Sequence, residues 1–191
     1  MKMQKNISII LMLFIFVIKI NAMNVWTIGD EVRINPETGK AFEENASVQP
    51  TGLTGDYKTS NWVWNKGTYT VTVYGAKNEV VAFQIIIERE NNEIINGINV
   101  FIDNLVGNNG TIDKSNIELF REWYAYIKKT SVTDYNVSIL EAGWYPEPLI
   151  PFTATKYGAP FYVPSTDFYM SDNINKLTNQ QNQAIWCDIF I

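Results

Sequence analysis

Apolar and polar residues alternate most clearly between residues 68 and 88. The first run places Tyr69, Val71 and Val73 on one side of an extended chain, since strand side chains point to opposite faces at every second residue. Turn residues follow at 75–78. The second run has Val81, Phe83, Ile85 and Ile87 on one face and Val80, Ala82, Gln84, Ile86 and Glu88 on the other. We therefore expect a hairpin whose second strand is an inner strand of a sheet, with the first of these two faces buried.

Shorter apolar runs recur along the rest of the chain, separated by turn residues. They lie at 25–28, 32–34, 97–102, 161–163 and 184–191. Residues 36–58 and 172–183 are polar or rich in Gly, Pro and Asn, and we expect both to be surface connections. Many short strands with scarcely any long helix predict an all-β fold, a β-sandwich of mostly antiparallel strands.

Residues 116–129 fit two patterns. Ser115 and Glu118 have the spacing of a helix capping box, and the apolar residues after them have roughly helical spacing. The segment is also rich in aromatic residues and alternates from Leu119 to Ile127, which is typical of a strand. The pattern leaves both structures open and slightly favours the strand.

Three prolines interrupt the aromatic segment 143–151. Proline fixes φ and removes a backbone donor, so we expect an extended, ordered loop here rather than a regular element. Such a loop would hold Trp144 and Tyr145 in place for a neighbouring domain or a ligand.

The first 22 residues have the pattern of a secretory signal peptide. Lys2 and Lys5 precede an apolar run at 7–18, and Ala22 offers a small residue for cleavage. We expect residues 1–22 to be a signal peptide helix, or disordered, apart from the globular body; an uncleaved N-terminal anchor is the alternative. Residues 23–191 would then form one β-sandwich domain in a secreted, periplasmic or cell-surface protein, with no membrane contact after cleavage.

Charge and composition exclude several kinds of partner and site. The formal net charge is −5, and loss of the three lysines in residues 1–22 takes it to −8, so nucleic acid and anionic membranes are not expected partners. The chain has no His and one Cys, Cys187, which excludes a Ser–His–Asp or Cys–His nucleophile, an ordinary zinc site and an intrachain disulfide. We expect Cys187 to be a small buried apolar residue.

We expect neither a metal nor a cofactor. Four residues close in sequence carry oxygen ligands but lack the spacing of a calcium loop: Asp103, Asn104, Asn108 and Asn109.

Four stretches, in this order and at fitting intervals, resemble a known family. They are Gly75 to Gln84 (GAKNEVVAFQ), Leu119 to Tyr124 (LFREWY), Gly143 to Pro151 (GWYPEPLIP) and Asn182 to Asp188 (NQAIWCD). Together they resemble the N-terminal β-sandwich domain of secreted bacterial proteins of the glycoside hydrolase family 123 type, in which the sandwich precedes a (β/α)-barrel. The resemblance covers residues 25–191 and implies that residues 119–127 are a strand.

The resemblance also implies that the chemistry lies in a barrel absent from this chain. Family members are similar to N-acetylhexosaminidases that use the acetamido group of the substrate, with an adjacent Asp-Glu pair in the barrel. The only such dipeptide here is Asp30-Glu31, near the start of the sandwich, where we expect a solvated turn without a catalytic role. The apolar ending at 189–191 favours an N-terminal part of a longer protein. The expected function is a non-catalytic domain that supports a C-terminal barrel, with the parent protein a glycoside hydrolase.

Two other functions remain as alternatives. One is an independent carbohydrate-binding module, because exposed aromatic rings stack on the apolar faces of sugars. Its candidate residues, which could instead contact a neighbouring domain, are Trp62, Trp64, Trp144 and Tyr145. The other is a self-contained hydrolase with a carboxylate pair of its own, Glu122 with Glu141 or Glu147.

Overall fold

The computed structural model describes residues 23–45, 53–107, 110–128, 142–168 and 176–191. Within these ranges the fold is all-β with antiparallel strand pairs, and its helical elements are two short 3₁₀ turns, so the predicted fold class is confirmed. The signal peptide helix expected over residues 1–22 lies outside the described residues.

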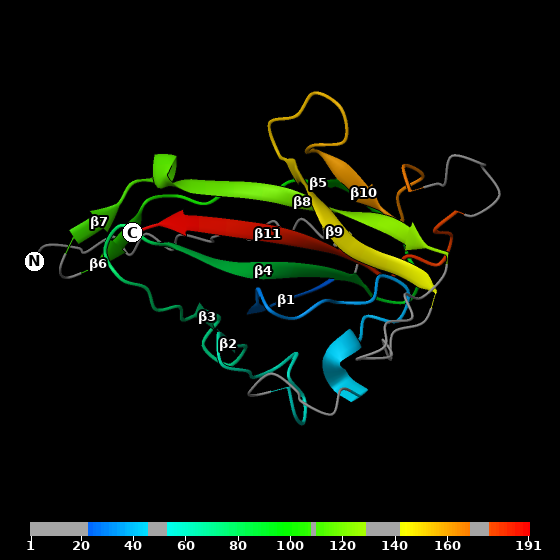
Figure 1. Cartoon of the computed structure of the whole chain (residues 1–191), viewed down its shortest axis with the longest axis horizontal. Coiled ribbons are helices and arrows are strands. Elements are labelled where there is room, and N and C mark those ends of the chain that lie inside the picture. The colour runs from blue at the N-terminus through cyan, green and yellow to red at the C-terminus, as the bar shows by residue number, and fades with distance from the viewer. Residues whose placement is uncertain (1–22, 46–52, 108–109, 129–141, 169–175) are drawn as a thin grey trace, which may run out of the picture.

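Five strands form the main sheet (Figure 1). In order across the sheet they are β1 (Met23–Gly29), β4 (Val80–Arg89), β11 (Asn182–Phe190), β8 (Ile117–Ile127) and β9 (Gly143–Pro151). The last strand in the sequence, β11, is the central strand, with β4 on one side and β8 on the other. The sheet is therefore held together by pairs between residues far apart in the sequence.

The predicted inner strand is β4, which pairs with β1 and β11. On its predicted core face Val81, Phe83 and Ile87 are buried, and Ile85 is half-buried against the same clusters. The predicted hairpin is wrong, because the preceding residues form β3 (Thr70–Val71), which pairs with β2 (Trp64–Asn65). Tyr69 has a φ of 50°, a left-handed conformation that interrupts the extended chain, and both edges of β4 are taken by strands from distant parts of the sequence.

Shorter segments cover both faces of the main sheet. Trp26, Ile28 and Ile86 on one face pack against buried residues of 32–41 and 53–64. The other face is covered by β5 (Ile95–Ile98) with β10 (Phe161–Val163) and by the hairpin of β6 (Leu105–Gly107) and β7 (Gly110–Ile112). The result is a sandwich-like fold in which one layer is a full sheet and the covering layers are short strands and irregular chain.

The predicted surface connection at 36–58 is in part a core segment. Ala41, Leu53 and Tyr57 are buried against the main sheet, and the first 3₁₀ turn, η1 (Phe42–Asn45), lies between them. The hydroxyl of Tyr57 accepts a hydrogen bond from the backbone N–H of Ala41 (3.0 Å). Apart from η1 and a bridge at Ala41, the described residues of this segment form no strand or helix, so its buried residues follow no strand or helix period. The expected strand at 32–34 is reduced to an isolated bridge between Ile34 and Ala41.

The open question over residues 116–129 is settled in favour of a strand, β8. The supposed capping box is instead a second 3₁₀ turn, η2 (Lys114–Asn116), whose N-cap is Asp113. The expected irregular loop at 143–151 is wrong, since these residues form β9. The prolines are tolerated because β9 is an edge strand bonded only to β8, with a register shift between Glu122 and Tyr124 on its partner.

The polar stretch that leads into β11 is in part buried where the sequence predicts a surface connection. Gln180, Asn182 and Gln183 are inaccessible to solvent. The side-chain N–H₂ of Gln180 donates to the backbone O of Asn182 (2.9 Å), and that of Gln183 donates to the backbone O of Glu122 (2.7 Å). These amides have partners inside the protein, which removes the cost that normally keeps them at the surface.

The guanidinium of Arg121 joins this polar network to the aromatic core. The side chain of Arg121 is fully buried, and its Nε donates to Gln183 Oε1 (3.2 Å). One terminal N–H₂ group donates to Asp167 Oδ2 (3.1 Å) and to the backbone O of Tyr157 (3.2 Å). The rings of Phe161 and Phe168 lie 4.7 and 4.9 Å from the guanidinium carbon. Arg121, a residue of β8, thus links this strand to β10, to β11 and to the segment around Asp167.

Removal of the Asp167 carboxylate should leave the buried guanidinium without its counter-ion. We expect Asp167→Ala to lower the free energy of unfolding by about 3 kcal/mol, as measured by urea denaturation. Lys40→Ala, which removes an exposed side chain loosely paired with Glu44 (3.9 Å), is the control and should cost less than about 1 kcal/mol. Equal effects of the two substitutions would contradict a structural role for the Arg121 pair.

Candidate functional site

The four aromatic residues proposed from the sequence do not form one site. Trp64, Trp144 and Tyr145 are all buried. The Nε1 of Trp64 donates to the backbone O of Lys58 (3.1 Å), Trp144 packs in the core cluster around Tyr124, and the ring of Tyr145 stacks on Phe42 at 4.5 Å. These three rings are closed to a sugar in this structure. Trp62 is half-buried and lines a surface hollow.

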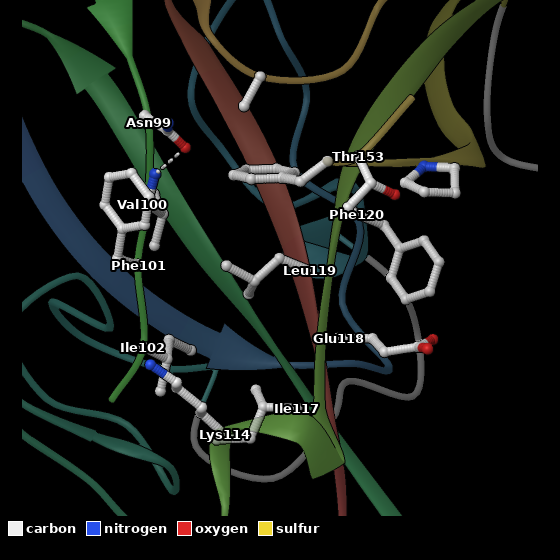
Figure 2. Close-up of a pocket in the computed structure, with 13 residues that line it drawn as sticks. Asn99, Val100, Phe101, Ile102, Lys114, Ile117, Glu118, Leu119, Phe120 and Thr153 are labelled. Atoms are coloured by element: carbon white, nitrogen blue, oxygen red, sulfur yellow. Dashed lines mark hydrogen bonds between the residues drawn. The ribbon is translucent and has the colours of Figure 1, made fainter. Parts of the chain in front are cut away.

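An apolar groove of about 580 Å³ lies between the segment 99–102 and the first part of β8 (Figure 2). Ile117 and Leu119 point into the space between the two segments, whereas Glu118 and Phe120 lie on the opposite side of the strand. The lining is mostly apolar, with Lys114 and Thr153 among its polar members. The groove is suited to apolar contact rather than to catalysis.

Exposed apolar side chains lie on both faces of the main sheet near the end where β11 finishes. Val80 and Phe190 face each other across β4 and β11 and are 54% and 47% exposed. The β6–β7 hairpin lies at the same end (Figure 1) and carries Leu105 and Val106, the latter 79% exposed. Phe101, 84% exposed, precedes Ile102, which packs in the core cluster beneath this end. We call Val80, Phe101, Leu105, Val106 and Phe190 the apolar end.

One buried carboxyl stands out from the rest. Glu122 on β8 is 4% exposed, and its Oε1 has no hydrogen-bond partner among the described residues. Burial, and secondly the Glu147 carboxylate on β9, raise the pKa of Glu122 to about 8. The structure therefore brings Glu122 close to Glu147, one of the two carboxylate pairs proposed for a self-contained hydrolase. Glu141, the other proposed partner of Glu122, lies outside the described residues. The Glu122 carboxyl holds a proton near neutral pH but is closed to a substrate.

The buried carboxyl should make the fold more stable in mild acid than in mild base. Between the ordinary pKa of a glutamic acid and about 8, the folded chain keeps the Glu122 proton and the unfolded chain has lost it, so stability falls as pH rises. The slope from this group is at most about 1.4 kcal/mol per pH unit. Glu122→Gln should flatten urea-unfolding stability between pH 5 and 8 and stabilise the chain at pH 8. A wild-type minus variant difference that stays constant across this range would contradict a neutral buried Glu122.

Other reactive or binding groups are inert or dispersed. Cys187 is buried as predicted, and burial raises the pKa of its thiol to about 12, which disfavours a reactive thiolate. In the described ranges, no group of three or more Asp, Glu and Cys side chains is placed to hold a metal ion. Within the same part of the chain, none of the helical segments is long and apolar enough to cross a membrane.

No protein-family model and no curated protein matches this sequence.

Sequence reasoning missed the apolar end. Leu105 and Val106 lie among Asp, Asn and Gly residues that read as turns, and their exposure follows from a hairpin that no local pattern indicates. A sequence pattern could have suggested only that two apolar residues stand in a polar segment.

Proposed function

We propose that residues 23–191 are a non-catalytic domain of a secreted glycoside hydrolase-like protein of the N-acetylhexosaminidase type, which supports a C-terminal barrel. The enzyme class rests on the resemblance of four ordered stretches, and export rests on the lysine-flanked apolar run at 7–18. The apolar end is the structural observation that carries the supporting role.

The apolar end has the character of a contact surface. Its five side chains are each more than a third exposed. Val80 and Phe190 lie on the face of the sheet that carries Ile86, whereas the hairpin with Leu105 and Val106 covers the other face. Large apolar patches on a soluble domain usually mark contact with another protein or domain. Full burial of one such side chain contributes about 1.5–3 kcal/mol, so a partner that covers several of them gains a substantial driving force.

The end of β11 lies at the apolar end, which is where the proposed barrel would join this domain. The backbone N–H of Ile191 donates to the backbone O of Glu79 (3.0 Å), and its carbonyl accepts from the N–H of Asn78 (2.7 Å). These hydrogen bonds fix the end of β11, including Phe190, beside Val80 at the start of β4. A domain joined after Ile191 would meet the apolar end first.

A catalytic role for this domain has weaker support. Glycoside hydrolysis uses two carboxyl groups that flank the scissile bond, and both must reach the substrate. Glu122 is enclosed, so the pair with Glu147 does not meet this need. Three of the four rings proposed for an independent carbohydrate-binding module are buried in the core. That function therefore has weaker support as well.

Acidic substitutions in the apolar end should separate docking from folding. In a protein that extends beyond Ile191, Val106→Asp with Phe190→Asp should weaken contact with the following domain and split one calorimetric unfolding transition into two. In the chain alone, the same pair should change the free energy of unfolding by less than about 1 kcal/mol, because both side chains are already exposed.

Ile94→Asp is the matched control, since Ile94 is exposed to a similar degree (53%) outside the apolar end. It should leave the extended protein with one transition. A gene that encodes no domain after Ile191 would refute the proposed function. So would an extended protein that still unfolds in one calorimetric transition when Val106 and Phe190 are both replaced by Asp.

A further inference from the structure

A surface hollow on the β1 side of the sheet combines aromatic rings with carboxyl groups. It has a volume of about 540 Å³ and is formed by the turn after β1, the turn before β2, the segment 72–74 and the start of β4. Trp62 and Tyr74 contribute rings, and Asp30 and Glu31 contribute carboxyls. We propose that this hollow is a saccharide-binding site for a neutral pyranose unit, which would stack on the rings while its hydroxyl groups donate to the two carboxylates.

Buried side chains hold the hollow in shape. The amide nitrogen of Gln84, a residue buried on β4, donates to the backbone O of Gly29 (3.0 Å) and of Val32 (2.6 Å), which fixes the turn that carries the two carboxyls. The amide nitrogen of Asn61 donates to the backbone O of Thr27 (2.8 Å), and its oxygen accepts from the N–H of Val63 (2.9 Å). Asn61 and Val63 directly flank Trp62 in the chain, so these hydrogen bonds fix the backbone on both sides of the ring. Ligand sites of this kind gain affinity because their groups need little ordering on binding.

Gly29 allows the ring and a carboxyl to come close together. A Cβ at this position would come within 2.6 Å of Trp62 Nε1 and would collide with the Glu31 carboxyl. The indole N–H of Trp62 and the carboxyl of Glu31 therefore both lie over the same backbone atom. This places a hydrogen-bond donor beside an acceptor, the pair that a sugar hydroxyl can use at once.

The indole N–H of Trp62 is available to a ligand, whereas the Glu31 carboxyl shares a hydrogen bond with the Asp30 carboxyl and keeps its remaining lone pairs for a ligand. Among the described residues, neither Asp30 nor Glu31 forms an ion pair with Lys or Arg, and Trp62 Nε1 has no hydrogen-bond partner. Burial and the neighbouring Asp30 carboxylate raise the pKa of Glu31, which shows that the two carboxyls lie near each other. Tyr74 is 86% exposed, so its ring has no cover from the rest of the domain.

A neutral pyranose fits this combination. One face of the ring presents C–H groups, which an aromatic surface covers, and the rim presents hydroxyl groups, which carboxylates accept. A lone apolar ligand would leave the carboxylates without partners, which disfavours its binding. The site is independent of docking at the apolar end, because it needs no second domain.

Isothermal titration of the whole chain with four neutral probes tests the proposal: tetrasaccharides of glucose, galactose, mannose and N-acetylglucosamine. We expect at least one to bind saturably with a Kd of roughly 0.1–1 mM, in the weak range for a shallow site. Trp62→Ala should weaken binding more than tenfold, and Trp62→Phe should retain part of it. Asp30→Asn should weaken it several-fold.

Tyr74→Ala and Tyr69→Ala form a matched pair, since both tyrosines are exposed (86% and 77%) and Tyr74 lines the hollow. Tyr74→Ala should weaken binding about five- to tenfold, whereas Tyr69→Ala should leave it unchanged. No saturable binding of any probe, or equal loss in both variants, would overturn the proposal. A glucosamine tetrasaccharide, whose amines are cationic, serves as a fifth comparison probe. Binding confined to this probe and abolished by 0.5 M salt would also overturn the proposal, because the hollow would then be a site for cations. None of these outcomes depends on the calorimetric docking test.

Discussion

The buried guanidinium of Arg121 is the interaction on which the rest of the structure most depends. A charged group is expensive to remove from water unless its donors are satisfied by a counter-ion and by hydrogen bonds. Asp167, Gln183 and the backbone O of Tyr157, from three separate segments, supply partners to Nε and Nη1. Nη2 is buried without a hydrogen-bond partner among the described residues. The sequence separation of the three segments means that the pairing of β8 with β11 and the position of the covering segments are fixed together.

The central strand β11 shows how this polar network and the apolar core divide the sheet. Its first residues, Asn182 and Gln183, are buried amides with internal partners, whereas Ile185, Cys187 and Ile189 are buried apolar residues. The polar end determines register, because a shift of one residue would separate Gln183 from Arg121. The apolar part of β11 stabilises the sheet because its side chains are removed from water. Towards its last residues the cover becomes incomplete, and the exposed apolar end begins there.

The sequence predicted the elements whose burial follows a strand period. The alternation in β4 identified the inner strand, and the resemblance identified β8 as a strand. The sequence did not predict which strands pair, because the pairing of β4 with β1 and β11 depends on residues far apart in the chain. It misread β9, where an edge position tolerates prolines, and the Gln-rich segment, where internal hydrogen bonds outweigh polarity. Of the candidate site, composition identified Trp62, but its meeting with Asp30 and Glu31 required the fold.

The apolar end and the aromatic hollow share one residue, and this connects their roles. Val80 belongs to the apolar end and also lines the hollow that contains Trp62 and Asp30. A domain seated on the apolar end would therefore border the hollow. A saccharide held by Trp62 would then lie beside the neighbouring domain rather than on a remote surface. Because the turn at Gly29 is fixed by Gln84 from within the sheet, the hollow would keep its shape whether or not that domain is present. Support of a neighbouring domain and placement of a sugar chain beside it are thus compatible roles for the same sheet.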